Sequence, residues 1–89
     1  MKFIIISFKS RNNLLKFVRI CRQYNINIDI INTPNIISKS CGLSGKTAYN
    51  NLNSIKNIIQ QLNYLDFMGI FYLERSGFQE RLQRLYWLI

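Results

Sequence analysis

The sequence predicts a single α+β domain with the element order β-α-β-β-α-β, an antiparallel sheet and both helices on one face of that sheet. Three observations lead to this class: strand-like apolar segments over residues 3–8, 26–30 and 70–73, two stretches with a helical apolar period, and a length of 89 residues that suits one modest core. This order is that of the ferredoxin-like, split βαβ arrangement. We expect residues 1–75 to form the domain and residues 76–89 to form a C-terminal helical extension.

The first strand and the first helix have the clearest local signals. Residues 3–8 (Phe-Ile-Ile-Ile-Ser-Phe) are β-branched and aromatic, which is typical of a strand buried on both faces. Ser10 is expected to cap a helix over residues 11–24. At about 100° per residue, one side of this helix collects the apolar side chains, which are Leu14, Phe17, Val18, Ile20, Cys21 and Tyr24.

The middle of the chain predicts a second strand and a weaker third strand. Ile26, Ile28 and Ile30 alternate with polar residues, which is the period-2 pattern of a strand. Pro34 ends this strand because proline cannot donate to a ladder. Residues 43–49 are expected to form the short third strand.

The last third of the chain predicts a helix, a strand and a final helix. The first of these begins at Asn50 or Asn51 and carries the apolar stripe Leu52, Ile55, Ile58, Ile59, Leu62 and Leu65. Gly69 opens a fourth strand over residues 70–73. Ser76 and Gln79 fit a capping box for a final helix with the apolar residues Phe78, Leu82, Leu85 and Trp87. Either this helix or a second subunit is expected to cover the face of the sheet that the other two helices leave open.

Positive charge is the main global clue to a partner. Twelve Lys and Arg against four Asp and Glu give a formal charge of +8, which suits nucleic acid, an acidic protein or anionic lipid. The basic residues are scattered, so charge alone names no partner. The candidate partner-binding residues are the basic side chains expected on helix surfaces, namely Lys16, Arg19, Arg22, Arg81 and Arg84.

An RNA-binding sheet is one candidate that this charge leaves open. Exposed strand aromatics can stack on bases, and the predicted strands offer Phe3, Phe8, Phe71 and Tyr72. The RNP-type pattern of glycine and alternating aromatics is absent, and the other strand residues are mostly isoleucine, which cannot stack. The sequence therefore favours a solvated basic face over RNA binding as the role of the arginines.

Side chains for catalysis or metal binding are scarce. There is no histidine, which removes the commonest general base and the commonest metal ligand. Two cysteines in different surroundings do not make a zinc site. The segment Ser44-Gly45-Lys46-Thr47 resembles a phosphate loop, but Ser40 stands where that motif requires its first glycine. We expect no cofactor and no metal.

The two cysteines predict different roles. Cys21 falls on the apolar side of the first helix, where cysteine behaves as a small hydrophobic residue. Cys41 follows a polar loop that Pro34 begins, and Gly42 comes next, so that a partner's sulfur could approach. Since the thiolate is the reactive form, nearby ammonium groups and hydrogen-bond donors would activate Cys41. The supporting residues are Ser38, Lys39, Ser40, Gly42 and Lys46. The equal alternative is a half-buried cysteine at a strand edge beside an ordinary turn glycine.

Three motifs together carry a family resemblance. They are Phe8-Lys9-Ser10 after the first strand, Thr33-Pro34, and Ile36/Ile37-Ser38-x-Ser40-Cys41-Gly42. Over roughly residues 3–73 the chain resembles a small bacterial selenium/sulfur carrier-like family. The resemblance implies that Cys41 carries sulfur or selenium as a persulfide or perselenide, with Gly42 and the preceding loop presenting it.

The leading functional hypothesis is a sulfur or selenium carrier rather than an enzyme. Cys41 would take sulfur from a donor such as a cysteine desulfurase and pass it to an acceptor protein. The alternatives are a basic binding module for RNA or an acidic protein, and an oligomerising structural domain in which Trp87 is buried against a second copy. No stretch approaches the roughly 20 apolar residues of a membrane span, and we expect a soluble cytoplasmic protein.

Overall fold

The computed structural model describes residues 2–34, 37, 42–62, 67–76 and 79–86. Within these described residues, five strands, two α-helices and one short 3-10 helix follow one another. They are β1 (Lys2–Phe8), α1 (Arg11–Gln23), β2 (Ile28–Asn32), β3 (Leu43–Ala48), η1 (Tyr49–Asn51), α2 (Leu52–Leu62), β4 (Phe67–Ser76) and β5 (Gln79–Tyr86). The strands form one sheet in the order β2-β3-β1-β4-β5, and every neighbouring pair is antiparallel.

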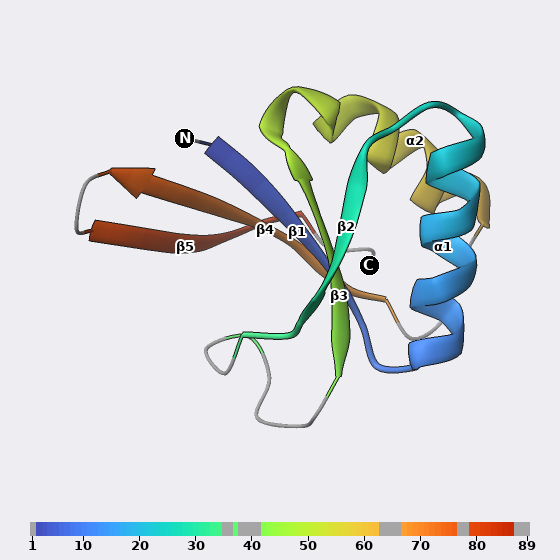
Figure 1. The fold of residues 1–89 in the computed structure, drawn as a ribbon, viewed down its shortest axis with the longest axis horizontal. Helices are drawn as coiled ribbons and strands as arrows, with labels where there is room; N and C mark the ends of the chain where they lie inside the picture. Colours follow the sequence, from blue (N-terminus) through green and yellow to red (C-terminus); the bar gives the residue numbers. More distant parts are fainter. Residues whose placement is uncertain (1, 35–36, 38–41, 63–66, 77–78, 87–89) are drawn as a thin grey trace.

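The predicted α+β class is confirmed. In the sheet, β3 lies between β1 and β2, and β1 lies between β3 and β4, so that the two β-α-β units are interleaved. Both α-helices lie on the same side of the sheet (Figure 1). This arrangement fits a ferredoxin-like class broadly, with β5 added at one edge.

The main core fills the space between the sheet and the helices. Ile4, Ile6 and Phe8 of β1 face the helices, since alternate residues of a strand point to the same side. Ser10 caps α1, accepting a hydrogen bond from the amide of Asn13 at 3.4 Å. The predicted apolar side of α1 is confirmed for its four buried members Leu14, Phe17, Val18 and Cys21, whereas Tyr24 is exposed.

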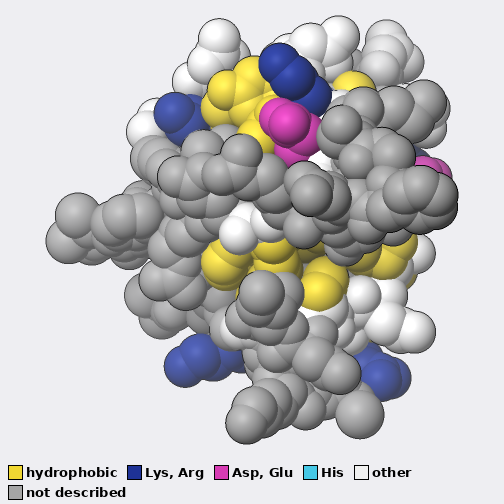
Figure 2. All heavy atoms as spheres, turned by 90° about the vertical axis from the view of Figure 1, so that its left-hand side faces the viewer, with side chains coloured by type: hydrophobic (Ala, Val, Ile, Leu, Met, Phe, Trp, Pro, Cys, Tyr) yellow, Lys and Arg dark blue, Asp and Glu magenta, His cyan; other side chains and the backbone are white. Residues whose placement is uncertain are grey.

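A second, smaller core lies on the other side of the sheet. It consists of Ile5, Phe71 and Leu73, with the partly buried Phe3, Ile31, Ile37 and Leu82 packed against it. Figure 2 shows hydrophobic side chains on this side of the molecule, between Lys and Arg side chains above and below them. Ile37 belongs to the connection between β2 and β3, so that connection supplies part of the cover.

The predicted C-terminal helix is wrong, because Gln79–Tyr86 form β5. This strand pairs antiparallel with β4, from Ser76 opposite Gln79 to Ile70 opposite Tyr86. The two strands are separated by Gly77 and Phe78 alone, a spacing that suits a hairpin as well as a helix start. The segment predicted as a separate extension therefore joins the sheet of the main domain. Trp87 lies outside the described residues.

Other differences concern element boundaries. The second strand begins at Ile28 rather than at residue 26, because Asn25 takes a left-handed conformation with φ 62° and the buried Ile26 precedes the ladder. The fourth strand begins at Phe67 and runs through Gly69, which has φ 139° and lies opposite Ser7, next to a register shift in β1. Gly69, predicted to open the strand, instead lies inside it and accommodates an irregularity.

Candidate functional site

The connection between β2 and β3, which carries Cys41, is closed at its base by a backbone hydrogen bond. The amide of Thr33 donates to the carbonyl oxygen of Gly42 at 2.9 Å, one residue beyond each strand. Residues 34–41 therefore begin and end at adjacent points of the sheet (Figure 1). The chain enters this connection from β2 and leaves it directly into β3.

The predicted site residues of this connection fall largely outside the described residues. Cys41, Ser38, Lys39 and Ser40 belong to that group, and the structure does not test their predicted roles. Gly42 is described and is partly buried. Pro34 is also described, and its carbonyl oxygen accepts a hydrogen bond from the amide of Ile37 at 2.9 Å.

A chain of three hydroxyl groups lies beneath this connection. The hydroxyl of Ser44 is 2.8 Å from that of Ser7 and 2.7 Å from that of Thr33. Ser7 and Ser44 are fully buried, both at 0 % exposure. The network links β1, β3 and the residue that begins the connection. It supplies each buried hydroxyl with a partner, which a buried polar group requires.

Sequence reasoning did not find this network. The sequence predicts Ser7 only as part of a buried strand, and Ser44 only as part of the weak third strand and of the rejected phosphate motif. The available signal was that both serines fall at buried strand positions, where a hydroxyl needs a hydrogen-bond partner. The partner itself could not be found locally, because Ser7 and Ser44 are 37 residues apart.

Gly42 and Gly45 both lie close to the side chains of neighbouring residues. A Cβ atom at residue 42 would lie 3.3 Å from the hydroxyl oxygen of Thr33, so that glycine leaves room for the hydroxyl network. A Cβ atom at residue 45 would lie 2.7 Å from Cδ1 of Ile28. Gly45 therefore serves the packing of β3 against β2, and the segment that resembled a phosphate loop is part of a strand.

Lys46, predicted to support Cys41, lies further along β3. Its ammonium nitrogen is 4.3 Å from the centre of the Phe3 ring, which is a cation–π contact. It lies four positions beyond Gly42 in the sequence, or roughly 13 Å at about 3.3 Å per residue. The described structure thus gives Lys46 a partner away from the base of the connection.

Cys21, the other cysteine, is a core residue, as predicted. It is 0 % exposed within the main core, and its thiol is free. Burial raises the pKa of the Cys21 thiol to about 12, and a backbone hydrogen bond offsets only part of this effect. The thiolate is the nucleophilic form of cysteine, so Cys21 is unreactive at neutral pH.

The predicted partner-binding residues do not form one surface. Lys16, Arg19 and Arg22 are exposed on α1, which confirms the basic outer face of that helix. Arg81 and Arg84 lie on β5, at the opposite edge of the sheet from β2, and their side chains are outside the description.

The strand aromatics considered for RNA are also divided. Phe3 and Phe71 lie on the side of the second core, whereas Phe8 is buried against Phe17, with ring centres 5.3 Å apart. Tyr72 packs edge-on against Tyr49. These rings do not make a shared platform.

The described residues contain neither a metal-binding cluster nor a helix that could span a membrane. Among the residues that the structure describes, there is no group of three or more His, Cys, Asp or Glu side chains that could hold a metal ion. Neither α1 nor α2, the described α-helices, is long and apolar enough to cross a membrane.

Comparison with known protein families identifies the family of this chain. A protein-family profile described as "Putative Se/S carrier protein-like" matches residues 3–71. The matched stretch begins in β1, ends in β4 and contains the whole connection between β2 and β3. No curated protein and no solved structure matches the chain.

Proposed function

Because this chain belongs to the Se/S carrier protein-like family, we propose that it accepts sulfur or selenium on Cys41 and passes it to another protein. The observation that carries the proposal is the family match over residues 3–71, which includes Cys41 and its neighbours. The family was also the one indicated by the motifs around Phe8, Thr33 and Cys41.

The chemistry is a transfer of a sulfane sulfur atom. The Cys41 thiolate attacks the outer sulfur of a donor persulfide, a new S–S bond forms to Cys41, and the donor's S–S bond breaks. The donor leaves as a thiolate, and Cys41 holds the persulfide. Delivery to the acceptor reverses these roles, so that no external oxidant or reductant is consumed. A perselenide would follow the same course.

Three features of the described structure support this role. The bond from Thr33 to Gly42 fixes both ends of the connection that contains Cys41. Gly42 places no side chain beside that residue. The hydroxyl network of Ser7, Ser44 and Thr33 anchors the base of the connection to β1 and β3.

The low reactivity of Cys21 supports Cys41 as the cysteine that carries the sulfur. With its pKa raised to about 12 by burial, Cys21 is protonated at neutral pH and has no access to a partner's sulfur. Cys41 is the other cysteine in the sequence. We assign supporting roles to Ser38 and Ser40 as hydrogen-bond donors to the thiolate, and to Lys39 as a cation near it.

The partners that this function requires are a sulfur donor, such as a cysteine desulfurase, and an acceptor protein. The cytoplasm is the compartment in which a free thiol of this kind stays reduced. RNA stacking is not favoured as a second function, because the strand aromatics are divided between the two faces of the sheet.

The test is an intact mass after incubation of the reduced protein with a cysteine desulfurase and cysteine. We expect a stable addition of one sulfur, about 32 mass units, on the wild type. The addition should be lost in Cys41→Ser and retained in Cys21→Ala, which is the matched control. A Cys41→Ser variant that still accepts sulfur would overturn the proposal.

A further inference from the structure

The outer edge of β2 carries backbone groups that can accept another strand. β2 lies at one end of the sheet and pairs with β3. In an antiparallel pair, opposite residues alternate between hydrogen-bonded and non-hydrogen-bonded positions. Since Thr33 bonds to Gly42, the backbone groups of Ile30 and Asn32 point away from β3 toward the open edge.

The bond made by Arg22 agrees with this assignment. Its guanidinium group donates to the carbonyl oxygen of Ile28 at 3.2 Å, and Ile28 has the same alternation as Ile30. This carbonyl therefore also faces the edge. A guanidinium group has five donors, so Arg22 keeps further donors for a carboxylate placed there.

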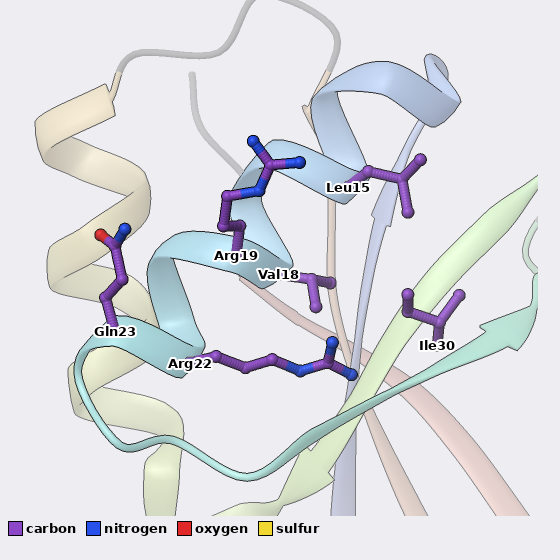
Figure 3. Close-up of a pocket in the computed structure, with 6 residues that line it drawn as sticks. All are labelled: Leu15, Val18, Arg19, Arg22, Gln23 and Ile30. Atoms are coloured by element: carbon purple, nitrogen blue, oxygen red, sulfur yellow. The ribbon is translucent and has the colours of Figure 1, made fainter.

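A groove runs along this edge between α1 and β2. It has a volume of about 460 Å³ and is lined by Leu15, Val18, Arg19, Arg22, Gln23 and Ile30. Figure 3 shows Leu15, Val18 and Ile30 around the space between the helix and the strand, and Arg22 reaching across from α1 toward β2. Leu15 and Ile30, which both line the groove, are exposed by 41 % and 39 %, so it offers apolar surface to an occupant.

The charged side chains of α1, the helix that lines the groove, are all positive. The 13 residues of α1, RNNLLKFVRICRQ, include no carboxylate, and of their basic residues Arg19 and Arg22 line the groove, whereas Arg11 does not. The acidic residue of β2, Asp29, lines a different pocket with Phe3 and Lys46 on the other side of the sheet. The groove therefore favours an occupant with negative charge at the end near Arg22.

We propose that the outer edge of β2 binds an extended acidic segment of a partner protein as an added strand. Its backbone pairs with Ile30 and Asn32, an apolar side chain opposite Ile30 enters the groove, and a carboxylate two residues away meets Arg22. A second copy of the chain is a poorer occupant, because it brings another +8 charge and the same arginines to the edge. Nucleic acid offers no strand backbone to pair with.

The outer edge of β2 adjoins the connection that carries Cys41, because β2 ends at Asn32 and Thr33 begins that connection. A segment bound at the edge would hold its protein beside the proposed sulfur site. The binding itself does not depend on sulfur chemistry. It is therefore tested in the Cys41→Ser variant, so that failure of one proposal leaves the other intact.

The probe is the capped peptide Glu-Thr-Val-Thr-Glu, which pairs antiparallel with β2 with its Val opposite Ile30 and so places a Glu near Arg22. We expect saturable changes in the amide NMR signals of Ile30 and Asn32, larger than those of Ile31, whose amide faces β3. Lys-Thr-Val-Thr-Lys should not bind. Methylating the amide nitrogen of the central Val should abolish binding, whereas methylating that of the following Thr, which faces away from β2, should not.

Two charge reversals on α1 provide a matched pair on the protein. Arg22→Glu should weaken the binding of the Glu peptide about fivefold. Arg11→Glu makes the same change in net charge away from the groove and should alter it by less than about twofold. Circular dichroism checks that both variants are folded.

Four results would overturn the proposal. They are the absence of saturable binding, equal binding of the Lys peptide, equal loss in the two charge variants, and tolerance of the methylated Val. Protection of the Ile30 and Asn32 amides in a dimer of the free protein would assign the edge to a second copy instead.

Discussion

The two faces of β1 differ in what they bury, although their residues alternate along one strand. Toward the helices, Ile4, Ile6 and Phe8 enter a core made of hydrocarbon and one thiol. On the other face, Ile5 enters a small cluster of three buried residues, and Ser7 joins a chain of hydroxyl groups. The first face holds the fold together, and the second face connects the sheet to the proposed sulfur site.

The largest expected effect is on the helix side of the sheet. Ile6→Ala should lower the free energy of unfolding by about 2–5 kcal/mol, because a cavity in a large packed core collapses poorly. The matched control is Ile5→Ala, the same change at the next residue on the other face, where the smaller cluster can relax. Urea denaturation measures both. A greater loss in Ile5→Ala would reverse our ranking of the two faces.

The next effect concerns the hydroxyl network. Ser44→Ala removes the hydroxyl that bridges Ser7 and Thr33 and should cost about 1–3 kcal/mol, since Ser7 is left buried without that partner. Ser7→Ala alone should also destabilise the protein. The double variant should cost less than the sum of the two, because the second change removes a group that has already lost its partner. Additive losses in the double-mutant cycle would contradict a coupled network.

The smallest effect is the pH dependence from Cys21. In the unfolded chain the thiol ionises near pH 9.0, whereas in the folded protein its pKa is raised to about 12 by burial. The unfolded state therefore loses a proton first as the pH rises. Stability should fall above the lower pKa, by about 1 kcal/mol at pH 9.5. The measurement is the difference between wild type and Cys21→Ala in denaturation from pH 7 to pH 9.5, which cancels the other titrating groups. A constant difference would mean that Cys21 is not shielded from solvent.

The elements that sequence reasoning found correctly are those with a strong local period. The apolar side of α1 follows from residues three and four apart, and its Ser10 cap is a local signal. The run of isoleucines in β1 likewise predicts a strand that is buried on both faces.

The sequence-based predictions are wrong where contacts between residues far apart in the sequence decide the structure. Ser76 and Gln79 fit a capping box, but pairing with β4 makes residues 79–86 a strand, and the local spacing suits a hairpin and a helix start equally. The hydroxyl network depends on residues from β1, β3 and the end of β2 that meet only in the folded sheet. For the candidate site, the motif identified Cys41 and Gly42, but the anchoring of its base was visible only in three dimensions.

Because Thr33 and Gly42 are hydrogen-bonded to each other, the number of residues in the connection between them can differ without altering the geometry of the sheet. For a flexible loop, doubling the number of residues between fixed ends adds only about 0.6 kcal/mol of closure entropy. Segments of other lengths and sequences can therefore be exchanged between these two anchor residues while the pairing of β2 with β3 is kept. In this sense the sheet is a frame on which the presented segment can vary independently, as antibody frameworks present loops of different lengths.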